Sequence, residues 1–531
     1  MERLRNIPHS VFLVLLCCLV LAAKSSAQAP AGKAEHVVII VFDGLRPDSV
    51  TEQDAPTLFH FAQRGTTFAN HHSVFLSSTE VNGTAIATGM SPGRSGIVAN
   101  DEYKPEIELL RPFNADSDWA AWTGDRLTHG QYLRAQTLTQ SVQHAGRSSA
   151  VAGTKGVALL LDRASGEYHG GGARVTLYEG RTLPAAVMDL VRPDYGPMPP
   201  KANPKKTANA QADRWTTNVL IDKLWNKEVP ALTMLWLSEP DYAQHGAGPG
   251  SKVGRAAVKS SDDNLTIVLK KLHDSGLGEK TDVLVVSDHG FSTISRAIDL
   301  ADLLKKAGFR AGKEFDAKPA AGDVMVVGHG GSASIYVGGR DTTTIEQLVE
   351  FLQKSDFAGV IFTRHAIDGT FTLDQAGLDS PDAPDIVVSF RWSDEANAVG
   401  LPGMVISDSE KRAPGQGIHA SLSRFDMHNT LIAAGPDFRA GFIDHLPSGN
   451  MDLAPTVLQI LGIKSEATLD GRVLTEALSG GDPGSSSSQS SKLSAERKLG
   501  DTTWSQYLNV SKVENTAYYD DGNGATTPLT K

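Results

Sequence analysis

Three short apolar runs, each followed directly by acidic or histidine residues, constrain this chain more than any other feature. The runs are Val37–Phe42, Ala231–Leu237 and Val283–Ser287. Each has the length of a buried strand and is bounded by polar or turn residues, and helical patterns such as Gln131–His144 and Leu265–His273 lie along the chain between and before them. This alternation predicts an α/β fold with a mostly parallel central sheet flanked by helices.

Composition excludes several classes of protein. The chain has 531 residues, 40% of them hydrophobic, with 50 Lys and Arg against 61 Asp and Glu and a formal net charge of −11. These values are ordinary for a globular protein and exclude a wholly disordered chain. Because no basic face dominates, we expect no nucleic-acid binding surface.

The first 29 residues have the pattern of a secretory signal peptide. Arg3 and Arg5 precede an apolar stretch from Val11 to Ala23, and small residues before position 30 predict cleavage after about Ala29. The stretch of about 13 residues is too short to span a bilayer, and no later stretch is long enough. Both cysteines lie inside this segment. We therefore expect a periplasmic or secreted protein with no disulfide and no transmembrane helix in the mature chain.

The rest of the chain divides by composition into a main domain with two cap inserts, a linker and a C-terminal hairpin. The inserts have more loops and weaker periodicity, and the linker is rich in Gly and Ser. Tyr507–Val513 and Thr516–Tyr519 flank a two-residue turn, and because a lone hairpin is marginally stable we expect it to pack on the main domain. The predicted ranges are 30–478 for the main domain, about 101–150 and 292–415 for its inserts, 479–492 for the linker and 493–531 for the hairpin segment.

Candidate ligands follow the three apolar runs. Asp43 follows the first run, Asp241 and His245 follow the second, and Asp288 and His289 follow the third. Ligands of open parallel sheets bind beyond the carboxyl ends of the strands, and Asp with His suits a divalent metal of the zinc type. A single Asp after a strand is more often a turn residue or a helix cap. The recurrence at three strand ends favours a metal site.

A possible nucleophile lies in the segment from Ser77 to Glu80. Ser77 and Glu80 match a capping box, and the small residues that follow predict a helix. Thr79 would then lie in the first turn, where free N–H groups and the helix dipole favour an anion. A hydroxyl next to a metal can lose its proton and attack phosphorus. From the residues alone, Ser77 or Ser78 could serve instead of Thr79.

Several longer motifs occur in order between Val37 and Leu474. They are Val41–Asp48, Thr79–Asn82 followed by Thr88-Gly89, Ser95–Asn100, Ser238–Pro249, Ser287–Gly290, Gly417–His419, Leu431–Phe438 and Asp452–Thr456. Together they resemble the type I phosphodiesterase / nucleotide pyrophosphatase branch of the alkaline phosphatase superfamily. The resemblance implies an alkaline-phosphatase-like sheet flanked by helices, with cap inserts, and a hydrolase that acts on small-molecule phosphate esters.

The resemblance also implies two divalent metal ions, of which Zn²⁺ is the expected identity. The implied ligands are Asp241, His245 and His419 for one ion, and Asp43, Asp288 and His289 for the other. Thr79 would attack and form a phosphothreonine ester, which is then hydrolysed, and Asn100 would donate a hydrogen bond to a phosphate oxygen. Asn82 and Arg163 are weaker candidates for substrate binding, and Asn82 fits better as a support for the nucleophile turn.

Three other histidines need an assignment. His428 lies nine residues after His419 and is a rival metal ligand. We prefer His419 because its distance to Gly435-Pro436 agrees better with the family. His71 and His72 lie close to the nucleophile segment, and we expect a surface-turn role for both.

The choice between diester and monoester substrates depends on basic groups. Some monoesterases of the superfamily use a Lys-Asp-Arg segment, to which the nearest match is Leu161-Asp162-Arg163. Lys155 lies six residues too early to supply the missing lysine. A monoester carries an additional charged oxygen and usually needs paired basic donors, so we favour a phosphodiester or pyrophosphate substrate. An alkaline phosphomonoesterase and an inactive phosphate-ligand-binding relative are the alternatives.

Overall fold

The computed structural model describes residues 32–162, 174–225, 228–408, 412–484 and 486–528. The predicted signal segment 1–29 and Arg163 lie outside these residues. Within the described ranges, no helix combines the length and the apolar character needed to cross a bilayer.

A nine-stranded sheet lies at the centre of the fold. Five adjacent strands, β10, β1, β9, β6 and β7, pair in parallel, and the strands next to them on either side, β21 and β8, pair antiparallel. The predicted α/β fold with a mostly parallel sheet is confirmed. In sheet order the strands are β22 (Phe442–Asp444), β2 (Thr66–Phe68), β21 (Leu431–Ala434), β10 (Thr281–Val286), β1 (His36–Phe42), β9 (Leu232–Leu237), β6 (Ser149–Gly153), β7 (Arg174–Tyr178) and β8 (Arg181–Leu183).

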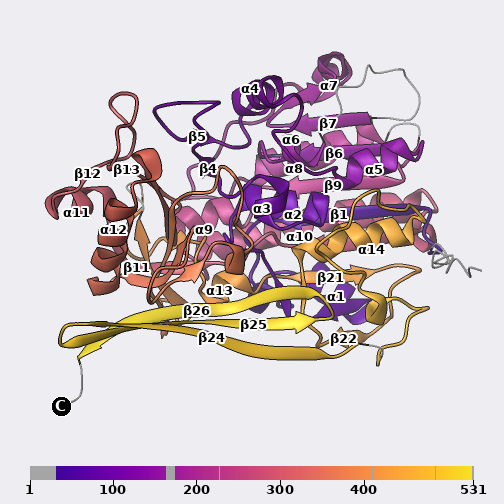
Figure 1. Ribbon diagram of the computed structural model, residues 1–531. Coiled ribbons are helices and arrows are strands. Elements are labelled where there is room, and N and C mark those ends of the chain that lie inside the picture. Colours follow the sequence, from indigo (N-terminus) through magenta and orange to yellow (C-terminus); the bar gives the residue numbers. More distant parts are fainter. Residues whose placement is uncertain (1–31, 163–173, 226–227, 409–411, 485, 529–531) are drawn as a thin grey trace, which may run out of the picture. The chain divides into compact units, whose positions relative to one another are not determined.

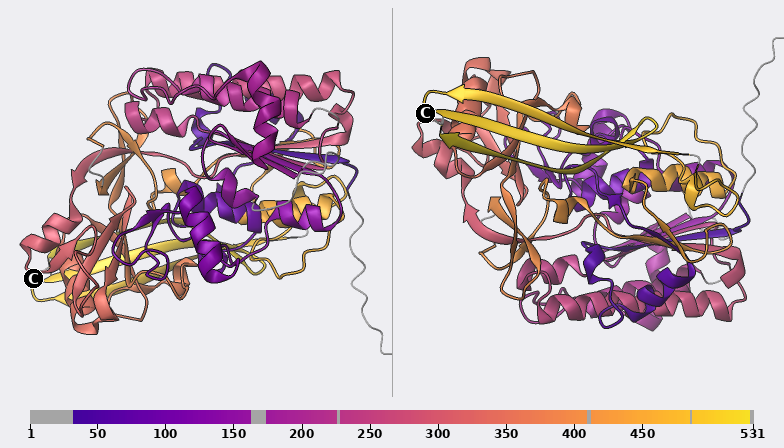
Figure 2. Two further views of the ribbon diagram at one scale, coloured as in Figure 1. Left: turned by 90° about the horizontal axis from the view of Figure 1, so that it is seen from above. Right: turned by 90° about the horizontal axis from the view of Figure 1, so that it is seen from below.

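Helices cover both faces of this sheet (Figure 2). Alternate residues of β1 point to opposite faces: Val37, Ile39 and Val41 join one apolar core, and Val38, Ile40 and Phe42 join the other. Burial on both faces explains why the strand is continuously apolar. The first core packs against α2 (Thr79–Thr88), α5 (Leu138–His144) and α14 (Leu453–Ile460), and the second against α1 (Pro56–Arg64), α8 (Ala210–Val219) and α10 (Lys252–Asp274).

The helix expected over Gln131–His144 begins seven residues later than predicted. Thr137 is the N-cap of α5, and it forms a capping box with Gln140. The side chain of Thr137 accepts a hydrogen bond from the backbone N–H of Gln140, which fixes the first turn at Leu138. The other α-helices are α3 (Pro92–Ser95), α4 (Asp118–Thr128), α6 (Ala158–Leu161), α7 (Met188–Tyr195), α9 (Asp241–Ala247), α11 (Leu300–Lys306), α12 (Thr342–Lys354) and α13 (Arg424–Met427).

The segment 292–415, expected as a cap insert, contains most of two further sheets. Helices α11 and α12 pack on the larger of the two and form a separate apolar core with it. In sheet order, the strands of the larger sheet are β12 (Arg310–Gly312), β13 (Asp323–Gly328), β14 (Ser332–Val337), β17 (Ile386–Phe390), β15 (Ala358–Thr363) and β16 (Phe371–Thr372). Those of the smaller sheet are β18 (Trp392–Ala396), β19 (Pro402–Asp408), β11 (Ser292–Ile298) and β20 (Gly417–Ile418). Two short pairs lie elsewhere, β4 (Asp101–Glu102) with β5 (Phe113–Asn114), and β3 (His71–His72) with β23 (Ser448–Gly449).

The C-terminal segment forms three antiparallel strands where a hairpin was predicted. They are β24 (Ser488–Leu499), β25 (Thr502–Val513) and β26 (Thr516–Pro528), drawn in yellow in Figure 1. The turn at Glu514-Asn515 is where the sequence predicts it, but β24 begins inside the predicted linker 479–492. Because β24 is an exposed edge strand, its polar Ser-rich start looks like a linker in the sequence. We call these three strands the C-terminal sheet.

Candidate active site

The ends of three adjacent parallel strands bring the predicted ligands to one edge of the central sheet. Asp43 follows β1, Asp288 and His289 follow β10, and Asp241 begins α9 shortly after β9. Because β1 pairs in parallel with both β9 and β10, their carboxyl ends lie side by side. One helical turn of α9 then places His245 on the same face as Asp241.

The six side chains form two clusters of three, in the two sets that the resemblance implies. In each cluster the candidate ligand atoms lie within 4.8 Å of one another. In the first cluster, Asp241 Oδ1 lies 3.1 Å from His245 Nε2 and 3.5 Å from His419 Nε2. In the second, His289 Nε2 lies 3.2 Å from Asp288 Oδ2 and 3.7 Å from Asp43 Oδ1. His419, rather than its rival His428, joins the first cluster.

One carboxylate oxygen of each aspartate in these clusters is buried without a hydrogen bond. Among the described residues, Asp43 Oδ1, Asp241 Oδ1 and Asp288 Oδ2 have no hydrogen-bond partner. Burying an unpaired carboxylate oxygen is costly unless a cation compensates it. The three oxygens therefore fit divalent cations held between the carboxylates and the imidazoles.

The histidines of the clusters are also oriented so that Nε2 can bind a metal ion. Their Nδ1 atoms lie next to backbone carbonyl oxygens, at 3.0 Å for His245 and Gly417, 2.8 Å for His289 and Gly290, and 2.9 Å for His419 and Ser77. An Nδ1–H that donates to a carbonyl leaves the lone pair on Nε2, where a metal binds. Burial, together with the charge of Arg412, lowers the pKa of His245 to about 4, so this ring is neutral at neutral pH.

Thr79 lies next to the second cluster. It is the first residue of α2, it is buried, and its Oγ1 lies 3.4 Å from His289 Nε2. The predicted capping box is absent: the N-cap is Ser78, no side chain caps it, and Ser77 Oγ donates to the carbonyl of Ser421 instead. Because the N-cap side chain does not cap the helix, the first-turn N–H groups of α2, apart from that of Glu80, suit an anionic ligand.

Asn100 also lies at this site. Its Oδ1 accepts a hydrogen bond of 3.1 Å from the backbone N–H of Glu80, the second residue of α2. This bond fixes which end of the side-chain amide faces the helix. Asn100 also lines the cavity next to the clusters, and its NH₂ group is a hydrogen-bond donor.

Asn82 holds together the turn that precedes α2. It is fully buried: its NH₂ group donates to the carbonyls of Val74, Leu76 and Ser78, and its Oδ1 accepts from the backbone N–H of Val74 and the side chain of Asn450. All of its polar atoms are therefore used within the protein. Arg163, the other weak substrate-binding candidate, lies outside the described residues.

We expect the change Asn82→Ala to lower the free energy of unfolding by about 3 kcal/mol, because several buried partners would lose their hydrogen bonds. Urea denaturation followed by circular dichroism measures this loss. Asn100→Ala is the matched control, since Asn100 makes one such bond and should change stability by less than about 1 kcal/mol. An Asn82→Ala protein as stable as the wild type would contradict the support role.

A cavity of about 580 Å³ opens beside the clusters. Its lining residues next to the clusters are His245, His419, Ser78 and Asn100. A cavity of this size can hold a ligand much larger than inorganic phosphate. Its other lining residues include Lys205, Tyr242, Lys313, His329 and Arg412.

The family model described as type I phosphodiesterase / nucleotide pyrophosphatase matches residues 37–393. The chain belongs to this family. The prediction from the ordered motifs, this branch of the alkaline phosphatase superfamily, is thereby confirmed.

Relatives in this family are distant in sequence but match most of the chain. The bis(5′-adenosyl)-triphosphatase enpp4 of Mus musculus is 22% identical over 434 residues, 81% of this chain and 78% of that protein. Ectonucleotide pyrophosphatase/phosphodiesterase family member 7 of Homo sapiens is 22% identical over 474 residues, 88% of each protein. The solved structure of murine ectonucleotide pyrophosphatase / phosphodiesterase 5, an inactive variant in complex with AMP, has a TM-score of 0.58 at 19% identity and covers 84% of this chain and 100% of that one. This similarity confirms the alkaline-phosphatase-like fold.

The structure of this type I phosphodiesterase family member places a basic residue at the site that the sequence did not place there. Lys155 follows β6, and its Nζ lies 2.8 Å from Asp43 Oδ2 and 2.7 Å from Asp241 Oδ2, between the two clusters. Although burial opposes its charge, the nearby carboxylates raise the pKa of Lys155 well above its usual value. The sequence analysis set Lys155 aside as six residues too early to supply the missing lysine, but its Nζ lies at the site. The short apolar run Ser149–Gly153 that precedes it was the available signal, because it ends at this edge of the sheet like the other three runs.

The expectation of a surface-turn role for His71 and His72 is also wrong. Both side chains are buried. His71 contacts Ser448 Oγ at 2.9 Å and Asn450 Oδ1 at 3.1 Å, which makes it part of the polar core. His72 and His428 belong to a separate cluster with Asp520.

Proposed function

We propose that this chain is a two-metal phosphodiesterase or nucleotide pyrophosphatase that acts through a phosphothreonine intermediate on Thr79. The observation that carries this proposal is the pair of Asp/His clusters with buried, unpaired carboxylate oxygens beside the Thr79 hydroxyl. Family membership supports the hydrolase class. The proposal adds the metals, the nucleophile and the order of the bond changes.

The donor sets suit two divalent cations of the zinc type, because each combines imidazole with carboxylate. Asp241, His245 and His419 would hold one ion. Asp43, Asp288 and His289 would hold the other. Bound there, the ions would supply Lewis acidity and positive charge for the entering and leaving oxygens of an in-line displacement.

The side chains of the protein have distinct roles in this reaction. Thr79 Oγ1 loses its proton and forms a bond to phosphorus, the bond to the leaving oxygen breaks, and the leaving oxygen takes up a proton. The first-turn N–H groups of α2 other than that of Glu80, together with the Asn100 NH₂ group, donate to the non-bridging oxygens. Water then bonds to phosphorus as the ester bond to Thr79 breaks, which regenerates the hydroxyl.

The cavity favours a substrate with a second group on phosphorus. Its volume of about 580 Å³ accommodates a nucleoside-sized group next to the phosphate. Relatives named as bis(5′-adenosyl)-triphosphatases, and a solved relative in complex with AMP, support a nucleotide substrate. The predicted signal peptide supports action in the periplasm or outside the cell, with cleavage after about Ala29.

The test is a rate comparison on the purified protein with known metal content. We expect bis-(p-nitrophenyl) phosphate to be hydrolysed with a higher kcat/KM than p-nitrophenyl phosphate. A higher value for the monoester would replace the phosphodiesterase proposal with the phosphomonoesterase alternative. Stoichiometric metal without turnover of any ester would support the inactive relative.

The position of Lys155 between the two clusters favours the phosphomonoesterase alternative. The expected preference for a diester rests on the absence of a paired lysine, and Lys155 supplies a lysine at 2.8 and 2.7 Å from carboxylates of the two clusters. An ammonium there could offset the additional charge of a monoester. We still favour a diester substrate, because the cavity is larger than a phosphate group needs and because the chain belongs to the phosphodiesterase family.

We expect Lys155→Ala to reduce kcat/KM for a monoester about tenfold more than for a diester, because only the monoester carries the additional charged oxygen. Lys205→Ala is the control, since this exposed lysine lines the same cavity but is not among the residues that pair with Asp43 and Asp241. Equal losses on both substrates would indicate that Lys155 serves the metal centre and does not select between esters.

A further inference from the structure

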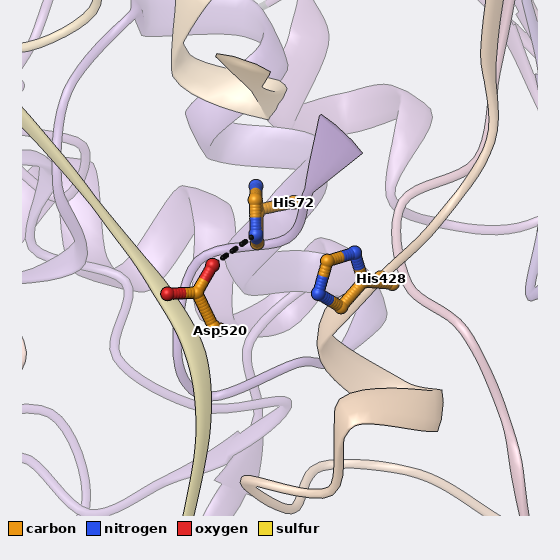
Figure 3. Close-up of side chains that lie close together, drawn as sticks. All are labelled: His72, His428 and Asp520. Carbon is orange, nitrogen blue, oxygen red and sulfur yellow. Dashed lines mark hydrogen bonds and ion pairs between the residues drawn. The ribbon is translucent and has the colours of Figure 1, made fainter. Parts of the chain in front are cut away.

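A third cluster of metal-ligand type lies where the C-terminal sheet meets the described part of the chain that precedes it, which we call the catalytic body. His72 comes from β3, His428 follows α13, and Asp520 comes from β26 (Figure 3). Their candidate ligand atoms lie within 4.8 Å of one another. The donor set, two imidazoles and one carboxylate, equals that of Asp241, His245 and His419.

Both ring nitrogens of His72 face hydrogen-bond acceptors. Its Nδ1 lies 3.0 Å from the carbonyl oxygen of Ser448, and its Nε2 lies 3.0 Å from Asp520 Oδ1. Both neighbours are acceptors, whereas a neutral imidazole has a single N–H. The arrangement is satisfied by a doubly protonated ring or by a cation at Nε2.

His428 indicates which of these two solutions applies. Its ring lies 4.4 Å from that of His72, centroid to centroid, and faces the same space (Figure 3). A proton on His72 would make no use of a second imidazole, whereas a metal ion would bind both.

The surroundings hold these side chains in place as an outer shell does in metal sites. The carbonyl of Ser448 fixes the tautomer of His72. Ser511 Oγ donates to both carboxylate oxygens of Asp520, at 3.0 and 2.8 Å. Asp520 is 20% exposed, which leaves a path for an ion.

We propose that His72, His428 and Asp520 bind a further divalent cation of the zinc type that fastens the C-terminal sheet to the catalytic body. Tetrahedral zinc with bonds of about 2.0 Å places its ligands about 3.3 Å apart, so the side chains need to move by about 1 Å. His72 lies within the residues 37–393 that match the family model, whereas His428 and Asp520 lie beyond them, so the site joins the matched region to the segment that follows it. This proposal is independent of the proposed catalytic function.

The test measures metal content and is insensitive to turnover. The full chain is stripped with a chelator, reloaded with excess Zn²⁺, freed of unbound metal and analysed for zinc per chain. We expect His428→Gln and Asp520→Asn each to hold one zinc fewer than the wild type. His365→Gln, at an exposed histidine elsewhere, is the matched control and should hold the wild-type number.

A second readout uses the unaltered chain, so a variant that misfolds does not decide the matter. Zn²⁺ is expected to protect His428 from diethyl pyrocarbonate at least fivefold and to leave His365 unprotected, as measured by peptide mass spectrometry. Equal zinc content in the wild type and both folded variants, or equal modification of His428 with and without Zn²⁺, would overturn the proposal. His72 and Asp520 would then form only an ion pair.

Discussion

Replacing Thr79 with alanine is expected to reduce turnover of bis-(p-nitrophenyl) phosphate by roughly 10⁴-fold or more, with the metal content unchanged. The hydroxyl oxygen of Thr79 forms the bond to phosphorus in the proposed mechanism. A water molecule in its place would be less well oriented and would react much more slowly. Thr79 contacts the second cluster through His289 at 3.4 Å but is outside both three-residue ligand sets. Steady-state kinetics together with zinc analysis measures both parts of this prediction.

Ser78→Ala is the matched control for this experiment. Ser78 precedes Thr79 and lines the cavity, and from the sequence it was a rival nucleophile. We expect this variant to keep activity within about tenfold of the wild type. If Ser78→Ala abolished turnover and Thr79→Ala did not, the nucleophile would be assigned to the wrong hydroxyl.

Removal of the metals is the second large effect that we expect. A chelator should lower the rate by about 10³-fold or more, and Zn²⁺ should restore it. Stability should fall as well, because burial and the charge of Asp288 already raise the pKa of Asp43, a sign that the metal-free site holds too much negative charge. Thermal unfolding with and without the chelator measures that part.

Asp288→Asn separates the catalytic effect from a general loss of metal. It should lower turnover about 10³-fold while the cluster of Asp241, His245 and His419 still binds its ion. The control Asp282→Asn changes a buried aspartate at the other end of the same strand, β10. Full activity after complete removal of metal would contradict the two-metal mechanism.

The sequence predicted those parts of the fold whose signal is local. The strands β1, β9 and β10 are buried on both faces, so their apolar runs are continuous and their ends are clear. Their carboxyl-end residues, Asp43 and Asp288 among them, therefore came together as expected.

Features that depend on distant contacts or on unusual local chemistry were missed. β24 is an exposed edge strand with a polar sequence, so it looked like a linker. β6 consists of small residues and was not predicted as a strand, so the sequence did not place Lys155 at the site. The cluster of His72, His428 and Asp520 joins segments that are more than 90 residues apart in the sequence, and no local pattern indicates such a meeting.

The most direct test of the account is an anomalous diffraction map at the zinc edge from crystals grown with Zn²⁺. We expect one peak in contact with Asp241, His245 and His419, and a second in contact with Asp43, Asp288 and His289. The two should lie about 4 Å apart, next to the Thr79 hydroxyl. An active protein whose map shows no peak at either cluster would contradict the account.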